Sequence, residues 1–243
     1  MQESIAMPTI HENLACWEND WLHDGEEWSD PWGGSEAQWN RTILPRIQAF
    51  LPCRSVLEIG PGRGRWTERL RHHCEKLALV ELSPRCIDYC KTRFAADCRL
   101  SYFVNDGLSL NMIPDRSIDF VFSFDSLVHA APDVCQAYIE QIAGKLTPDG
   151  CCFLHHSNLG NYRDQLDDST TYLVEHWRDR DMTGEFMIEY CRQAHLCCFK
   201  QELLNWRDSP WPIDAFSYIA PQDSHLAAPT EVILIDDFMS EAG

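Results

Sequence analysis

The chain has no run of about 18 consecutive apolar residues, the minimum for a membrane-spanning helix. It also starts with Met1-Gln-Glu-Ser, without the basic and then apolar stretch of a secretory signal. From these two absences we expect a cytoplasmic protein that makes no contact with a membrane.

Basic residues are scarce, with 20 Lys and Arg against 38 Asp and Glu and a formal net charge of -18. Proteins neutralise the phosphates of nucleic acids with clustered Lys and Arg, so this composition argues against a DNA or RNA partner. The acidity helps to keep the protein soluble and suits a neutral or cationic ligand better than an anionic one. We expect a small-molecule partner, and a homo-oligomer is compatible with the sequence.

The paired Cys-x-x-Cys units of a structural zinc site are also missing, although the chain has 12 cysteines. The cysteines are scattered through expected strands and helices, and Cys151 and Cys152 are adjacent. Disulfide frameworks belong mostly to small secreted chains, and free cysteine packs as a small hydrophobic residue. We therefore expect free, mostly buried thiols and no bound metal.

What the chain does have is a glycine-rich turn between a short apolar strand and the start of a helix. Gly60, Gly62 and Gly64 follow the strand Ser55–Ile59 at alternate positions, and glycine permits positive φ and close approach of a ligand. A G-x-G pattern alone is weak evidence. Glu58, two residues before the first glycine, would oppose a phosphate, so the turn favours a cationic ligand.

A second apolar segment, Leu77–Val80, ends in Glu81, about 20 residues after the glycine turn. In doubly wound α/β folds an acid at this place accepts hydrogen bonds from ribose hydroxyls. Ser83 and Pro84 then suit the cap and the first turn of a helix. The spacing therefore predicts a nucleoside-containing ligand.

Further short strands are expected at 101–104, 118–124 and 151–156, each followed by polar residues. The segment 118–124 is almost continuously apolar, as is typical of a parallel strand that is covered on both faces. Because parallel strands end at one edge of a sheet, Asp125 and the residues after the other strands should meet there.

In this order the segments resemble the class I S-adenosylmethionine (SAM) dependent methyltransferases, whose first motif has the form E-x-G-x-G-x-G. The resemblance covers about Trp28 to Phe238, and the segments Trp32–Trp39 and His155–Gly160 resemble a bacterial small-molecule subgroup. It implies a Rossmann-like α/β fold with a seven-stranded, mostly parallel sheet, helices on both faces and an N-terminal helical cap. The seventh strand, at 230–235, is expected to be antiparallel.

The resemblance also implies a cofactor site for SAM, with S-adenosyl-L-homocysteine (SAH) as the product. The glycine turn would hold the methionine part, the acid after the second strand the ribose, and the segment after the third strand the adenine. The implied cofactor-binding residues are Glu58, Gly60, Gly62, Gly64, Glu81, Leu82, Asn105, Asp106, Gly107, Phe124 and Trp39.

We expect two parts in the chain: an N-terminal cap or lid at 1–52 and the methyltransferase domain at 53–243. The cap is rich in tryptophan, and the sequence does not distinguish a lid over the cofactor from helices that pack on the sheet. An insertion at about 158–181 lacks strand-like alternation and includes Asp167 and Asp168, so it is a candidate for substrate recognition.

Candidate catalytic residues lie at the expected carboxyl edge of the sheet: His156, His129 and Asp125. His155 and His156 point to opposite faces if the strand continues through them, and His156 is the preferred base. Asp125 with one or two of these histidines could instead hold a divalent metal.

The expected activity is SAM-dependent methyl transfer to a hydroxyl of a small molecule, either a sugar or a secondary metabolite. A hydroxyl needs a general base, which gives the histidines a role. A small-molecule N-methyltransferase, a non-catalytic SAM-binding protein and an NAD-dependent oxidoreductase are the alternatives.

Overall fold

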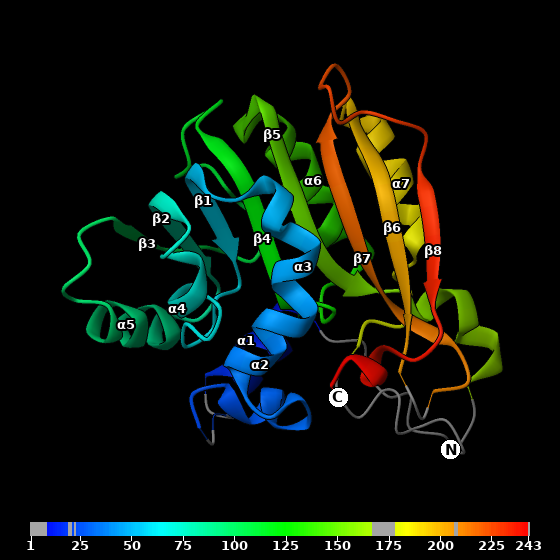
Figure 1. Cartoon of the computed structure of the whole chain (residues 1–243), viewed down its shortest axis with the longest axis horizontal. Helices are drawn as coiled ribbons and strands as arrows, with labels where there is room; N and C mark the ends of the chain where they lie inside the picture. Colours follow the sequence, from blue (N-terminus) through cyan, green and yellow to red (C-terminus); the bar gives the residue numbers. More distant parts are fainter. Residues whose placement is uncertain (1–8, 19–20, 22, 167–177, 207–208, 243) are drawn as a thin grey trace.

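The computed structural model describes residues 9–18, 21, 23–166, 178–206 and 209–242. One eight-stranded sheet runs through these residues, in the order β3-β2-β1-β4-β5-β7-β6-β8 (Figure 1). The strands are β1 (Cys53–Ile59), β2 (Cys74–Glu81), β3 (Leu100–Val104), β4 (Ile118–Leu127), β5 (Leu146–Ser157), β6 (Leu196–Asn205), β7 (Pro212–Pro221) and β8 (Glu231–Ile235).

The α-helices are α1 (Ile10–Trp17), α2 (Ser35–Gln38), α3 (Leu44–Ile47), α4 (Thr67–Leu70), α5 (Pro84–Arg93), α6 (Pro132–Lys145) and α7 (Gly184–Gln193). Helical segments of other types are η1 (Glu26–Trp32), η2 (Trp39–Ile43), η3 (Gln48–Phe50), η4 (Leu159–Gln165) and η6 (Phe238–Ala242). The side chain of Ser83 caps α5 as expected, accepting a hydrogen bond from the amide of Cys86 at 3.3 Å.

The α/β fold and the mostly parallel sheet are confirmed, but the sheet has eight strands instead of seven. The antiparallel strand is β7, which lies between β5 and β6 and pairs antiparallel with both. The expected antiparallel segment at 230–235 is instead β8, which pairs parallel with β6 at the edge. Strand β7 could not be predicted from the sequence, because nearly all of its residues are buried and the strand therefore shows no alternation of polar and apolar residues.

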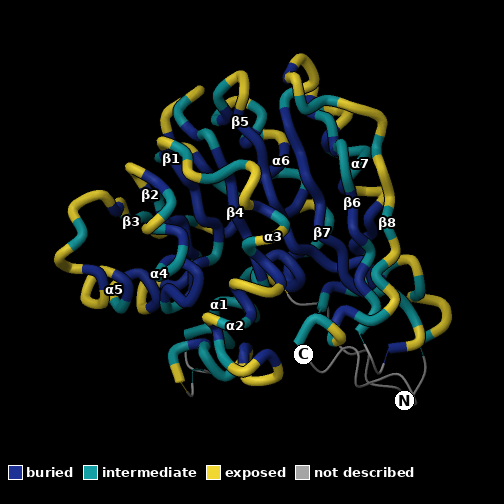
Figure 2. Tube along the Cα trace, in the orientation of Figure 1, coloured by how far each residue is buried: buried dark blue, intermediate teal, exposed yellow. Residues whose placement is uncertain are grey.

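Two apolar cores cover the two faces of the sheet, and the strands between them are buried along most of their length (Figure 2). One core joins the sheet to the N-terminal helical segments, α4, α5 and η6. The other joins it to α6 and α7, which lie behind the sheet in Figure 1. Burial on both faces explains the continuous apolar run in β4, whose central residues are fully buried.

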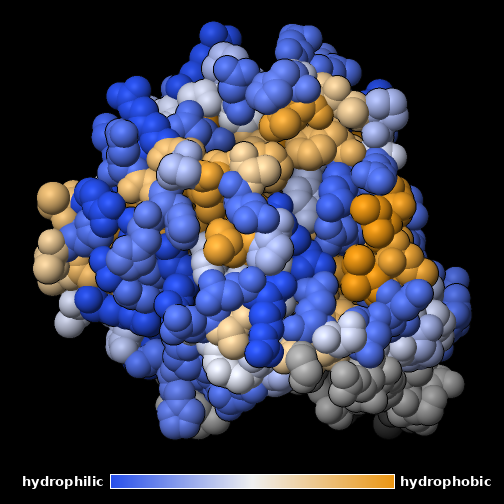
Figure 3. Space-filling view, viewed as in Figure 1, coloured by the Kyte–Doolittle hydropathy of each residue, from blue (hydrophilic) through white to orange (hydrophobic). Residues whose placement is uncertain are grey.

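The edge strand β8 carries apolar side chains on the surface. Val232 and Leu234 are each 54% exposed, and Figure 3 shows a hydrophobic patch in the region of this strand. All 12 cysteines are free, and eight of them are buried, which confirms the expectation of mostly buried thiols. In the described part of the chain, no helix has the length and apolar character to cross a membrane.

Candidate functional site

A cavity of about 410 Å³ lies at the carboxyl ends of β1, β2 and β4. The strand order reverses between β1 and β4, and ligands of open α/β sheets bind at such a switch point. Residues from α1, from the turns after these strands and from the start of α6 form the wall: Thr9, Ile10, His11, Asn13, Leu14, Trp17, Ile59, Gly60, Val80, Glu81, Leu82, Ser83, Gly107, Ser126, Leu127, His129, Ala130, Ala131, Asp133, Val134 and Tyr138.

The glycine turn packs too tightly for side chains. Gly60 has φ +69°, and a Cβ there would lie 1.9 Å from the Oγ of Ser126. Gly62 has φ +56°, and its Cβ would lie 2.4 Å from the ring of Trp21. Both positions therefore require glycine, for a left-handed backbone and for lack of space. Gly60 lines the cavity, whereas Gly62 and Gly64 lie outside its wall.

Glu81 lines the cavity and ties it to the glycine turn. Its carboxylate accepts hydrogen bonds of 2.9 Å from the amides of Gly62 and Ser83, and burial raises the pKa of this carboxyl. A carboxylate oxygen has two lone pairs, so further acceptor capacity remains. Glu81 and the adjacent Leu82 both lie in the wall, and their contact with a cofactor stays a prediction.

Gly107, in the segment after β3, lines the cavity, and hydrogen bonds of Asn105 hold this segment in place. The side chain of Asn105 accepts from the amide of Gly107 at 3.1 Å and donates to the hydroxyl of Tyr138 at 2.9 Å. Asp106, the expected adenine ligand, is exposed and lies outside the wall. Its carboxylate accepts from the amides of Leu108 and Ser109 and shapes the turn instead.

Glu58 is buried behind the glycine turn and does not line the cavity, and its expected contact with a cationic ligand stays a prediction. Its carboxyl accepts a 2.6 Å hydrogen bond from the hydroxyl of Thr67 in α4. Burial raises its pKa to about 8, despite the hydrogen bond, which lowers it. The acidic residue of the motif thus joins the turn to the helix that follows.

Two expected cofactor residues belong to the core instead of the cavity. Trp39 is 4% exposed and stacks on Trp66 and His73, with ring centroids at 6.4 and 5.8 Å. Phe124 is 3% exposed and packs against Trp66 at 5.4 Å. Both rings are apolar surface that the sheet and the N-terminal segment bury against each other.

Helix α1 covers the cavity, and the sequence analysis did not identify it. Ile10, Leu14 and Trp17 line the cavity and follow one another at helical spacing, which is a signal that the sequence contains. Thr9 and Glu12 form a capping box at the start of the helix. The described part of the segment 1–52 is thus largely helical, and its role as a lid stays a prediction.

The structure separates the candidate histidines. His129 lines the cavity, and its ring centroid lies 4.9 Å from that of Trp17. His156 is fully buried, with one ring nitrogen 2.8 Å from the carbonyl of Ser157 and the other 2.8 Å from the hydroxyl of Ser217. Burial lowers the pKa of His156 to about 4. The preference for His156 as the base is wrong, because both of its nitrogens are engaged away from the cavity.

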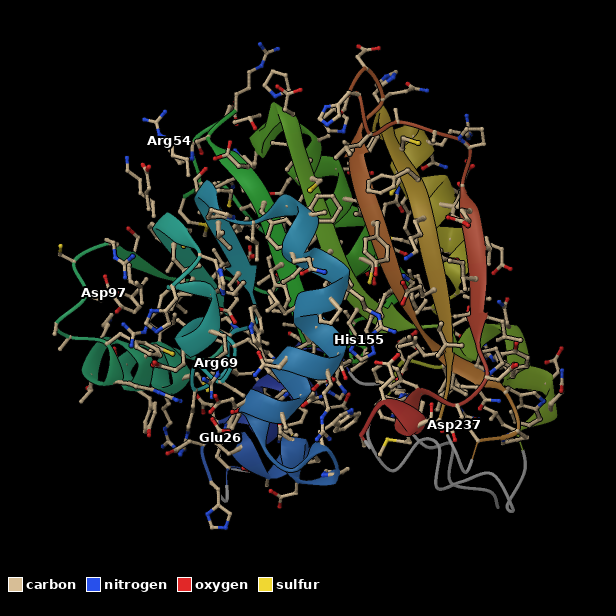
Figure 4. All side chains as sticks on the ribbon, viewed as in Figure 1. Glu26, Arg54, Arg69, Asp97, His155 and Asp237 are labelled. Atoms are coloured by element: carbon tan, nitrogen blue, oxygen red, sulfur yellow. The ribbon has the colours of Figure 1, made fainter. Side chains whose placement is uncertain are left out.

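Five charged side chains from different elements form a row at the carboxyl edge, which we call the charged row: Arg65, Asp125, His155, Asp214 and Arg178. Arg65 lies 2.6 Å from Asp125, whose other carboxylate oxygen lies 3.2 Å from Nδ1 of His155. Nε2 of His155 lies 3.5 Å from Asp214, and Arg178 binds Asp214 through two hydrogen bonds of 2.7 and 2.8 Å. Figure 4 shows His155 near the carboxyl end of β5.

The groups in this row shift one another's pKa values toward the ionised forms. Burial alone would raise the pKa of Asp125, but hydrogen bonding to His155 and the charge of Arg65 lower it. Burial alone would lower the pKa of His155, but the two carboxylates beside it raise it. Sequence reasoning found Asp125 but not its connection to Asp214, which lies on the unrecognised strand β7.

The expected insertion at 158–181 is described only in part, because residues 167–177, including Asp167 and Asp168, lie outside the described residues. It supplies η4 and Arg178. Across the described ranges, no cluster of three His, Cys, Asp or Glu side chains is arranged to hold a metal ion.

Residues 56–150 match a family model described as a methyltransferase domain. The ribosomal RNA small subunit methyltransferase A of Geobacter metallireducens is 33% identical over 76 residues, which are 30% of this chain and 28% of that protein. Nodulation protein S of Rhizobium tropici is 33% identical over 81 residues, 32% of this chain and 34% of that protein. The chain thus spans about a third of the length of these curated relatives.

Solved structures share the fold over a greater length. The N-methyltransferase NodS of Bradyrhizobium japonicum, in complex with SAH, matches with a TM-score of 0.61 and 18% identity, over 85% of this chain and 97% of that chain. A geranyl diphosphate C-methyltransferase of Streptomyces coelicolor matches with a TM-score of 0.62 and 10% identity, over 88% and 99%. Residues 56–150 thus match a methyltransferase domain, and the chain shares its fold with SAM-dependent methyltransferases of known structure.

Proposed function

We propose that the protein binds SAM in the cavity between β1, β2 and β4 and transfers its methyl group to a hydroxyl of a small molecule, a sugar or a secondary metabolite. The observation that carries the proposal is the cavity wall, where Gly60, Glu81, Leu82 and Gly107 come together from three different turns. Its volume of about 410 Å³ lies within the range of small-molecule sites.

The residues of the wall suit the parts of this cofactor. Glu81 offers a carboxylate to the ribose hydroxyls, and Leu82 offers apolar surface to the adenine. Gly60 lets the chain pass close to the methionine part without a Cβ in the way. Helix α1 lines the cavity with Ile10 and other apolar side chains, and the wall would position the reacting groups for a displacement reaction.

Methyl transfer to a hydroxyl breaks the bond between sulfur and the methyl carbon while the bond from oxygen to that carbon forms. The hydroxyl proton must then pass to a base. Two expected candidates lie at the end of β4: His129 on the cavity wall, and Asp125 directly before Ser126, which also lines the cavity. His156 has no part in this step.

A small-molecule amine is the second candidate acceptor. The similarity to nodulation protein S and to the NodS N-methyltransferase favours it, and the net charge of -18 suits a cationic acceptor. The same charge counts against an RNA acceptor, although ribosomal RNA methyltransferases are among the relatives.

Calorimetric titration with SAH tests the cofactor site. Glu81→Ala should weaken SAH binding at least tenfold, because the ribose loses its carboxylate partner. Glu75→Ala is the matched control, since this acid lies on the same strand β2 but is exposed and outside the cavity wall, and it should bind SAH within threefold of the wild type. No SAH binding by the intact protein would overturn the proposal.

A panel of radiolabelled methyl-transfer reactions then tests the acceptor. Sugars and hydroxylated metabolites are expected to accept the methyl group, whereas exclusive transfer to amines would replace the first candidate with the second. SAH binding without turnover on any acceptor would instead support a non-catalytic SAM-binding protein.

A further inference from the structure

Strand β8 is an open edge of the sheet (Figure 1). It pairs with β6 on one side, and in the described part of the chain no strand lies on its other side. Its sequence, Glu-Val-Ile-Leu-Ile, contains neither Lys nor Pro. Natural edge strands often carry such residues, because the bare N–H and C=O groups of an edge otherwise pair with another chain. Strand β8 can therefore accept a further strand along its outer side.

The side chains of β8 give this edge an apolar surface. Val232 and Leu234 are each 54% exposed. They lie in register with Gln201 and Leu203 of β6, and residues in register on neighbouring strands point to the same face of a sheet. Gln201 donates to the carbonyl of Gly184 at the start of α7, so this is the face that α7 covers. Figure 3 shows the patch among mostly hydrophilic surface.

The distribution of charge makes this edge suitable for a second copy of the same chain. Each copy carries a net charge of -18, so two copies repel each other over most of their surfaces. Between Glu231 and Asp236, however, the four residues 232–235 are all apolar and carry no charge. Contact along β8 therefore brings apolar side chains together and few like charges.

The sequence of β8 is complementary to itself in an antiparallel pairing. With a two-fold axis through the centre of the strand, Val232 of one copy lies opposite Leu234 of the other, and Glu231 lies opposite Ile235. Apolar cross-strand pairs of this kind stabilise a sheet, and no acid faces another acid. An axis shifted by one residue toward the C-terminus would instead set Glu231 opposite Asp237. The charges therefore favour the central register.

We propose that the protein forms a homodimer in which β8 pairs antiparallel with β8 of a second copy and joins the two sheets. The contact uses the same surface on both copies, so it closes at two chains and covers both β8 edges. Stable dimers bury about 1,200 to 2,000 Å² in total, and a pair of strands of five residues lies at the lower end, so the dissociation constant should be micromolar. The cofactor cavity, at β1, β2 and β4, takes no part in this contact.

Sedimentation equilibrium of the full chain tests the dimer. Dimers should form between about 1 and about 200 μM, the range that a micromolar dissociation constant covers. Raising the NaCl concentration from about 0.05 to about 0.5 M should strengthen the dimer several-fold, because salt screens the repulsion between two copies of charge -18.

Two substitutions on β8 test the register. Val232→Glu and Leu234→Lys should each weaken the dimer at least tenfold, because each sets one charge against an apolar side chain. A mixture of the two variants should recover part of the affinity as a heterodimer, since the proposed register sets the added carboxylate opposite the added ammonium. Val104→Lys is the matched control, because Val104 is also apolar and 45% exposed but ends β3 at the opposite edge of the sheet. It should leave the dimer within threefold of the wild type.

Four results would each overturn the proposal: a monomer over the whole concentration range, growth into species larger than a dimer, an undiminished dimer in both variants, or no recovery in the mixture. Urea unfolding checks that the variants fold. Their midpoints should stay close to that of the wild type, since Val232 and Leu234 are half-exposed, and a dimer that weakens only where the midpoint falls would also count against the pairing. None of these measurements uses SAH, so the result is independent of the proposed function.

Discussion

Replacing Glu58 with glutamine should stabilise the protein at alkaline pH, although this residue belongs to the motif that identifies the fold. Its carboxyl is 1% exposed, and burial raises its pKa to about 8 from an ordinary value of 4.5. At neutral pH most of the folded molecules therefore hold Glu58 protonated, while the unfolded chain holds it ionised. Glutamine has the size and polarity of a protonated glutamate, but it has no proton that titrates in this pH range.

The sign and size follow from proton linkage. Between pH 4.5 and 8 the folded state binds more protons at this site, so its contribution to stability is complete below pH 4.5 and is lost as the pH rises through 8. A difference of about 3.5 pKa units, at about 1.4 kcal/mol each, corresponds to roughly 5 kcal/mol. Glu58→Gln should therefore gain up to about 5 kcal/mol over the wild type between pH 4.5 and pH 9.

Urea unfolding at pH 4.5, 7 and 9 measures this difference directly. The control is Glu75→Gln, which removes a carboxyl that is exposed on strand β2. If the free-energy difference between Glu58→Gln and the wild type is the same at pH 4.5 and pH 9, the pKa of Glu58 is the same in the folded and unfolded states and the reasoning from burial fails. In that case the hydrogen bond from Thr67, which lowers the pKa of Glu58, would offset the effect of burial.

Two further predictions follow from the site and the sheet. His156 has a pKa of about 4 in the folded protein and about 6.5 in the unfolded chain. The wild type should therefore lose roughly 3 kcal/mol of stability as the pH falls from 6.5 to 4. In urea unfolding, His156→Gln should flatten this dependence on pH. Gly60→Ala should lower SAH affinity at least tenfold in calorimetry, because the new Cβ meets the side chain of Ser126. Ser126→Gly in the same chain should restore part of that loss, and no recovery would contradict the steric explanation.

The sequence predicted the glycine turn and the acid after β2, because there the backbone itself carries the signal. Gly60 and Glu81 could be located because a left-handed turn and an acid at the end of a strand have few substitutes. Glu58 and Asp106 fit the same pattern equally well, yet both carboxyls satisfy other parts of the backbone or of a helix. Residue type and spacing do not say which way a side chain points once neighbouring elements pack around it.

The charged groups at the carboxyl edge of the sheet were much less predictable. The sequence placed Asp125, His155 and His156 near the carboxyl edge, but it favoured the histidine that packs into the interior. The charged row needs Asp214 from β7, a strand that shows no alternation because both of its faces are buried. The capping box and the apolar spacing of helix α1 are features of the sequence that predict a helix at this place.

Local chemistry thus determined the strand and turn order, the glycine positions and the α/β class, because these depend on backbone conformation and on neighbours in the chain. Only the tertiary structure decided which groups meet. Arg65 and Asp214 are about 150 positions apart, and they reach the same site through Asp125 and His155 because β4, β5 and β7 are neighbours in the sheet. Long-range pairing of strands brings those charges together, and no local pattern in the sequence encodes that pairing.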